Sequence, residues 1–123
     1  MEILVEGRQL AHRVEVAAGF AQRLVGLLGR SGLAPGEGLL LAPCTSIHTL
    51  GMRFPIDVLL LDEAGTVLRV LEGLPPWRIP ASAKGTRLVL ELGPGTLAAT
   101  PVVAGERIAF SAGRQLDRWP SLR

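Results

Sequence analysis

Short stretches of apolar or alternating residues, separated by turn-forming residues, make up most of this chain. Alternation places successive side chains on opposite faces of a strand, and Gly, Pro and Asp between the stretches favour turns. The strands that this pattern predicts span residues 2–6, 12–16, 39–41, 56–61, 66–71, 87–92 and 106–110. Many short strands at regular spacing predict a mainly β protein with a compact antiparallel β-sandwich or barrel-like fold.

Two pairs of neighbouring stretches are expected to form β-hairpins. The first hairpin joins residues 2–6 to 12–16 across a Gly-Arg-Gln turn. The second joins Ile56–Leu61 to Thr66–Leu71 across an Asp-Glu-Ala-Gly turn. Within it, Val58–Leu61 is apolar on both faces, which is typical of a strand that is covered on both sides.

One segment has helical spacing instead. Its apolar residues stand at i, i+4, i+7 and i+8, on one face of a helix: they are Phe20, Leu24, Leu27 and Leu28. We therefore predict a short amphipathic helix over Gly19–Gly29, in the N-terminal third of the chain. A single helical turn is expected at Thr96–Thr100.

The length of 123 residues predicts one domain, with a hydrophobic content of 48% that supports a core without metal or disulfide staples. We assign residues 1–112 to a single β-rich domain and residues 113–123 to a polar C-terminal tail. The one Cys cannot form an internal disulfide, and neither a signal peptide nor a membrane-spanning apolar run is visible. The expected location is the cytoplasm.

The charged residues give no indication of nucleic-acid binding. The net charge is +2, and twelve Arg and one Lys are spread along the chain among the Glu residues. The chain has no Tyr, and aromatic residues make up only 4% of it, so a base-stacking surface is not expected. The partners we expect are a small molecule or a protein, with no nucleic acid and no membrane. The absence of Asn fits a possible thermophile.

The stretch Pro43–Asp62 holds the only Cys, one of the two His and one of the two Met. Three functions compete for it, and the leading one is binding of a small ligand or protein partner by a non-catalytic β-domain, because loops that interrupt a sheet tend to carry binding residues. The candidate ligand-binding residues are Arg30, Ser46, His48, Met52, Arg53 and Asp57.

The other two functions are a soft-metal site and an enzyme. Thiolate, imidazole and thioether from Cys44, His48 and Met52 would suit copper or zinc. An enzyme would use Cys44 as nucleophile, His48 as base and Asp57 as the group that orients the base. Along one strand, however, Cys44 and His48 would lie about 13 Å apart, which weakens both hypotheses. We therefore expect no metal, no cofactor and no catalytic residue.

Each of these residues also has a structural explanation. A single Cys beside an apolar strand is usually a small buried hydrophobe, and Met52 would fill the core. Asp57 would accept backbone N–H bonds or pair with Arg53 or Arg30. His48 would be a hydrogen-bonded structural residue.

Five segments of the chain carry a family resemblance. They are Gly26–Arg30, Gly36–Gly38 before an apolar strand, Cys44–Asp62, Leu90–Thr96 and Gly105–Ile108. In their order and spacing they resemble the domain of unknown function 192 family, over roughly Ala17 to Phe110. The chain has Leu28 where that family often has Met, and a Cys-x-Ser-Ile-His form of the central segment. The resemblance implies a β-sandwich-like fold in an uncharacterised bacterial and archaeal family, and it implies no activity.

Overall fold

The computed structural model of the protein describes residues 1–17, 32–43, 46–47, 54–76, 81–111 and 116–117. Within these ranges the chain forms eleven strands and one short helix. In chain order they are β1 (Glu2–Val5), β2 (Arg8–Ala11), β3 (Arg13–Ala17), β4 (Glu37–Leu41), β5 (Ser46–Ile47), β6 (Ile56–Leu61), β7 (Val67–Leu74), β8 (Ala81–Ser82), β9 (Leu88–Leu92), α2 (Thr96–Ala99), β10 (Ile108–Ser111) and β11 (Leu116–Asp117).

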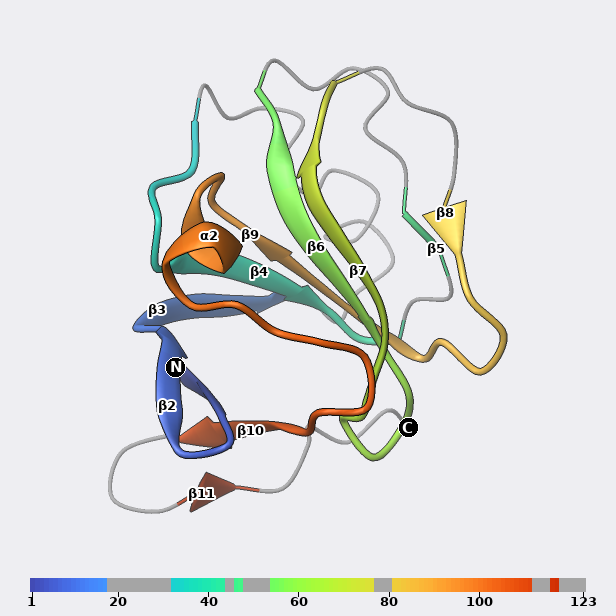
Figure 1. The fold of residues 1–123 in the computed structure, drawn as a ribbon. Helices are drawn as coiled ribbons and strands as arrows, with labels where there is room; N and C mark the ends of the chain where they lie inside the picture. Colours follow the sequence, from blue (N-terminus) through green and yellow to red (C-terminus); the bar gives the residue numbers. More distant parts are fainter. Residues whose placement is uncertain (18–31, 44–45, 48–53, 77–80, 112–115, 118–123) are drawn as a thin grey trace.

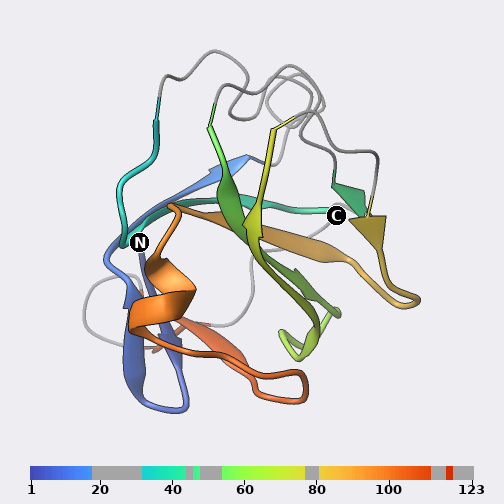
Figure 2. The same cartoon turned by 45° about the horizontal axis from the view of Figure 1, so that its top comes forward.

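Two sheets make up the fold, together with a separate short pair of strands (Figures 1 and 2). The first sheet has the order β11-β10-β1-β2 and the second the order β3-β4-β9-β6-β7, while β5 pairs with β8. The fold is therefore mainly β, as predicted, without a closed barrel. Among the described strands the pairing is antiparallel, except that β3 pairs in parallel with β4.

The N-terminal hairpin exists, but its second strand begins earlier than predicted. β1 pairs with β2, which starts at Arg8, through a two-residue turn in which Glu6 and Gly7 have φ values of 48° and 79°. Positive φ at both positions is the geometry of a type I′ turn, whose twist suits a tight hairpin. The chain bends at His12 and enters the second sheet as β3, so residues 13–17 lie beside β4 and are not the partner of β1.

The second predicted hairpin is confirmed, with β7 extending three residues further than expected. β6 pairs antiparallel with β7, and all six residues of β6 are buried. Asp62 Oδ1 accepts hydrogen bonds from the N–H groups of Ala64 and Thr66, both at 2.9 Å, which stabilises the turn between them. On its other side β6 pairs with β9, so it is a central strand covered on both faces.

Alternation along the strands of the second sheet divides the buried residues into two cores. The first core combines residues from both sheets, including Leu88, Leu90 and Leu92 on one face of β9. The second core occupies the opposite face of β9, where Val89 lies. Its members are Leu33, Leu39, Leu41, Phe54, Ile56, Val58, Leu60 and Val89.

Backbone hydrogen bonds that do not belong to the strand pairs connect the two sheets. The Val67 N–H donates to the Glu106 carbonyl at 2.8 Å, and the Ile108 N–H donates to the Gly65 carbonyl at 2.9 Å. At a second place, the Val14 N–H donates to the Met1 carbonyl at 2.9 Å. These bonds fix the position of the first sheet relative to β3 and β7.

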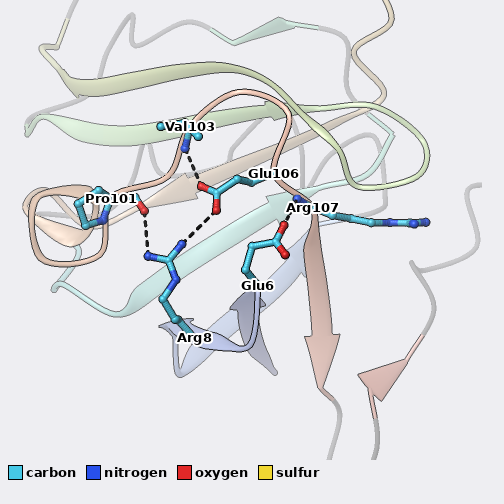
Figure 3. A network of polar contacts seen from close by, with 6 residues as sticks. All are labelled: Glu6, Arg8, Pro101, Val103, Glu106 and Arg107. Carbon is cyan, nitrogen blue, oxygen red and sulfur yellow. Dashed lines mark hydrogen bonds and ion pairs between the residues drawn. The ribbon is translucent and has the colours of Figure 1, made fainter.

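Side chains reinforce the same region, around the turn of the N-terminal hairpin (Figure 3). Arg8 Nη2 lies 3.2 Å from Glu106 Oε2, and Glu106 Oε1 accepts a hydrogen bond from the Val103 N–H at 2.8 Å. The Arg107 N–H donates to Glu6 Oε1 at 3.3 Å. The hairpin turn is thereby attached to the loop that leads into β10.

The helix that the structure describes, α2, is in the C-terminal half of the chain, where a single helical turn was predicted. The helix predicted at 19–29 lies outside the described residues. Two residues of the predicted C-terminal tail form β11, which pairs with β10 through Phe110↔Asp117 and Ser111↔Leu116. Among the helices of the described ranges, none is long and apolar enough to cross a membrane.

Candidate functional site

The structure describes only part of the central stretch that the sequence analysis singled out. Ser46 is in β5, where its backbone pairs with Ser82 of β8, and the Arg69 guanidinium of β7 donates to the Ser82 carbonyl at 3.2 Å. The other candidate residues lie outside the described residues: these are Arg30, Cys44, His48, Met52 and Arg53. Their ligand-binding, metal-binding and catalytic roles stay predictions.

Asp57 is the predicted site residue whose side chain the structure describes, and it is completely buried. Its Oδ2 accepts a hydrogen bond from the Leu97 N–H at 2.9 Å, and its Oδ1 accepts one from the Gly73 N–H at 2.8 Å. Leu97 is in the first turn of α2, whose N-cap residue is Gly95 and has no capping side chain. Asp57 therefore caps the helix from a neighbouring strand.

The second partner of Asp57 belongs to an irregularity in β7. The register between β6 and β7 shifts between Ile56 and Val58, and Gly73 has a φ of 64°. At such a bulge one backbone N–H has no partner on the neighbouring strand. Here it is the Gly73 N–H, which donates a hydrogen bond to the Asp57 carboxylate instead. With both oxygens bonded to backbone donors, Asp57 holds β6, β7 and α2 together, which is the structural role considered for it from the sequence.

A pocket of about 320 Å³ lies at the β3 edge of the second sheet. Among the described residues, those that line it are Arg13 and Glu15 of β3, Glu37 and Gly38 of β4, and Leu33. The parallel register pairs Arg13 with Glu37 and Glu15 with Leu39. Because side chains alternate along a strand, this register directs Arg13, Glu15 and Glu37 toward the face that carries the second core.

The turn before β4 gives this pocket one wall. Ala34-Pro35-Gly36-Glu37 is closed by a bond from the Glu37 N–H to the Ala34 carbonyl at 3.0 Å. Gly36 has a φ of 84°, so Pro and Gly occupy the positions that a type II turn favours. Glu37 Oε1 also accepts the Ala34 N–H at 3.1 Å, and Glu37 Oε2 lies 3.8 Å from Arg13 Nη1. The carboxylate of Glu37 is thus held between its own turn and the neighbouring guanidinium.

The segment after β9 packs against this turn. A Cβ atom on Gly93 would lie 2.1 Å from the Ala34 carbonyl oxygen, so the two backbones are in direct contact. Thr96 Oγ1 accepts a hydrogen bond from the Gly36 N–H at 3.2 Å and donates one to the Gly93 carbonyl at 2.7 Å. Because this buried hydroxyl both accepts and donates a hydrogen bond, it fixes the turn against the start of α2.

The pocket carries charges of both signs beside an apolar residue. The Arg13 side chain is 76% exposed and that of Glu37 is 32% exposed, whereas Leu33 is buried as part of the second core. In the described part of the chain, no three His, Cys, Asp or Glu side chains are close enough together to hold a metal ion. The described lining therefore combines a guanidinium, carboxylates and an apolar side chain.

The DUF192 family, described as "Uncharacterized ACR", matches residues 2–110. The chain belongs to the DUF192 family. The match runs from β1 to β10 and so includes all five described residues that line the pocket.

Two crystal structures share the fold of this DUF192 protein. A protein of unknown function from Novosphingobium aromaticivorans is 22% identical, with a TM-score of 0.78 over 89% of this chain and 84% of that one. A protein from Sinorhizobium meliloti described as a "putative transcription regulator" is 27% identical, with a TM-score of 0.74 over 87% of this chain and 90% of that one. No curated protein matches the sequence.

The pocket of the DUF192 protein is not evident from the sequence pattern alone. Arg13 and Glu15 were interpreted only as part of a strand, and Glu37 only as part of a turn motif. The available signal was the alternation of Arg13 and Glu15 on one face of that strand. The pocket also needs β3 to pair with β4, and periodicity along a single strand does not reveal its neighbour.

Proposed function

We propose that this DUF192 protein is a non-catalytic β-domain that binds a small polar molecule in the pocket between β3 and the Leu33–Gly38 segment. The observation that supports it best is the pocket itself, where Arg13, Glu15 and Glu37 come together beside Leu33. Its volume of about 320 Å³ is at the lower end of the range usual for small-molecule sites, about 300–1,000 Å³. A small ligand suits it better than a large cofactor.

The way the pocket is held supports a binding role. The turn that carries Glu37 contacts Gly93 directly and is hydrogen-bonded to Thr96, so its backbone is already ordered. Order that exists before binding lowers the entropy cost of taking up a ligand. The exposed Arg13 then provides an accessible charged group on an otherwise fixed frame.

Other classes of function have less support from the described residues. The label of the Sinorhizobium protein concerns transcription, but α2 has only four residues and no basic residue in its last turn, so it does not provide a recognition helix for the major groove. The soft-metal and catalytic hypotheses depend on Cys44, His48 and Met52, which lie outside the described ranges. The proposal also includes the cytoplasmic location expected from the sequence.

The test is a fragment screen by NMR on the ¹⁵N-labelled full chain. Small charged and polar molecules should shift the amide signals of Arg13, Glu15, Glu37 and Gly38 first, because these residues line the pocket. Arg13→Gln should weaken these shifts. Arg87→Gln is the matched control, because Arg87 is also exposed but precedes β9 at the end opposite Leu92, the residue paired with Gly38. A screen in which no molecule moves the pocket signals would contradict the proposal.

A further inference from the structure

The charged groups of the described pocket lining differ in how firmly they are engaged within the protein. We propose that the pocket binds a small molecule through an oxyanion group, a carboxylate or a phosphate, which is held by the Arg13 guanidinium. This inference rests on the proposed function and narrows it to a chemical class. Three observations carry it: the contacts of the two carboxylates, the exposure of the Arg13 side chain and the attachment of its backbone.

The two carboxylates of the described lining have partners within the protein. Glu37 Oε1 accepts a hydrogen bond from the Ala34 N–H at 3.1 Å, and Glu37 Oε2 lies 3.8 Å from Arg13 Nη1. Glu15 also has an interaction partner within the chain. A ligand that paired with either carboxylate would have to displace or share an existing contact, so we assign the ligand contact to neither of them.

Arg13 differs from these carboxylates because its described contact is long. The 3.8 Å between its Nη1 and Glu37 Oε2 exceeds the roughly 2.7–3.2 Å of a hydrogen bond, so the two groups are near each other but not hydrogen-bonded. The Arg13 side chain is 76% exposed, which leaves guanidinium N–H donors accessible at the pocket. A guanidinium binds carboxylate or phosphate oxygens through two parallel hydrogen bonds. An oxyanion would therefore gain hydrogen bonds that Glu37 leaves unmade.

The backbone at Arg13 is attached to the pocket wall, so only the side chain has to adjust to a ligand. The N–H groups of His12 and Arg13 both donate to the Gly36 carbonyl, at 2.9 Å and 3.2 Å. Gly36 belongs to the turn that carries Glu37, and its own N–H donates to Thr96 Oγ1. Order of this kind before binding lowers the entropy cost of taking up a ligand.

Glu37 then acts as a competitor of the ligand for Arg13. Its carboxylate lies beside the guanidinium, so an incoming oxyanion meets a group of its own sign there. Glu37→Gln removes this charge, while the amide oxygen still accepts the Ala34 N–H. The variant should bind the oxyanion more tightly, whereas a role of Glu37 in holding the ligand would predict weaker binding.

The experiment compares a carboxylate with its amide by NMR titration of the ¹⁵N-labelled full chain. 4-Methylpentanoate and 4-methylpentanamide have the same shape and the same short aliphatic body, but only the first is an oxyanion. 3-Methylbutyl phosphate provides the phosphate arm. We expect at least one of the two anions to shift the amide signals of Arg13, Glu15 and Gly38 at a concentration at least about tenfold lower than the amide does.

Variants test the assignment to Arg13. Arg13→Gln should weaken oxyanion binding about tenfold, and Glu37→Gln should tighten it about threefold. Arg87→Gln, which removes an exposed guanidinium outside the described lining, should leave it unchanged. Binding to the unmodified protein should also weaken in 1 M NaCl, because salt screens an exposed charge.

The possible results separate this inference from the function on which it rests. Tighter binding of either anion than of the amide supports the inference, and the better anion identifies the oxyanion as carboxylate or phosphate. If the amide binds as tightly as both anions, or if only fragments without an oxyanion move the pocket signals, the inference is wrong and the proposed function stands.

The variants can overturn the inference as well. Oxyanion binding that is unaffected by Arg13→Gln, or that Glu37→Gln weakens, would mean that another group holds the anion. If no fragment moves the pocket signals, the inference and the proposed function both fail. Should a variant lose its dispersed spectrum, the three titrations of the unmodified protein still decide the question.

Discussion

At the scale of single residues, Asp57 shows how a carboxylate that attracts attention in a sequence can serve the fold. Its two backbone partners, Gly73 and Leu97, are 16 and 40 positions away along the chain. The apolar run after Asp57 indicated that it would be buried, and a buried carboxylate needs donors, so backbone bonding could be foreseen. Which residues would donate these bonds could not be foreseen, because that depends on a bulge in β7 and on where α2 begins.

This account predicts the effect of replacing Asp57. Asp57→Ala should lower the free energy of unfolding by about 2–4 kcal/mol, because it leaves the buried N–H group of Leu97 without its acceptor and removes the part-buried hydrogen bond from the Gly73 N–H. Asp57→Asn should cost less, since the amide oxygen still accepts one of the two bonds. Urea denaturation measures both changes, and Glu63→Gln in the exposed turn before β7 is the control, expected within about 0.5 kcal/mol of the unmodified protein. Equal midpoints for all three variants would show that Asp57 does not hold these elements together.

At the scale of elements, strands were easier to predict than their partners. Ile56–Leu61 is apolar at nearly every position, and this pattern gave the limits of β6 correctly. For β3, alternation indicated a strand but wrongly suggested that it returns beside β1. Pairing was decided by the Glu6-Gly7 turn, which closes the hairpin at Arg8 and leaves residues 13–17 free to pair in parallel with β4. The parallel pairing brings Arg13 beside Glu37 at the edge of the sheet. A pattern along one strand does not show which strand lies beside it, so it could not predict the pocket.

The contact between the β9–α2 connection and the Leu33–Gly38 segment makes a prediction at this scale. Gly93→Ala should lower the free energy of unfolding by about 2 kcal/mol or more, because the new Cβ would lie 2.1 Å from the Ala34 carbonyl oxygen and force two backbones apart. Gly32→Ala is the matched control: a Cβ there meets nothing within 4 Å, and the expected change is within about 0.5 kcal/mol.

Thermal unfolding followed by circular dichroism compares the two alanine variants. A Gly93→Ala variant as stable as Gly32→Ala would mean that the turn can move away from α2 at little cost. The rigid wall that we assign to the pocket would then be absent. The proposed binding site would lose the preorganisation on which part of its support depends.

At the scale of the whole molecule, the two sheets behave as one unit because backbone bonds join them directly. Val67 of the second sheet and Glu106, in the loop before β10, share an N–H to carbonyl bond of 2.8 Å, and Gly105 returns one to the Val67 carbonyl at 2.8 Å. Val67 is 1% exposed, so these bonds are protected from water. The composition and the strand pattern could predict a two-sheet protein with one core between the sheets. They could not predict the second core on the other face of β9, because that requires knowing the strand order.

The side chains at this junction should contribute much less to stability than its backbone bonds. Arg8 and Glu106 form an ion pair of 3.2 Å, but their side chains are 47% and 21% exposed. Exposed pairs are screened by water and salt, and ordering two long side chains costs entropy. A double-mutant cycle with Arg8→Ala and Glu106→Gln, which keeps an acceptor for the Val103 N–H, should therefore give a coupling energy below about 1 kcal/mol. The coupling should fall further when the denaturation is repeated in 1 M NaCl. A salt-independent coupling of about 2 kcal/mol or more would instead mean that the ion pair shown in Figure 3 is a main attachment of the N-terminal hairpin to the loop before β10.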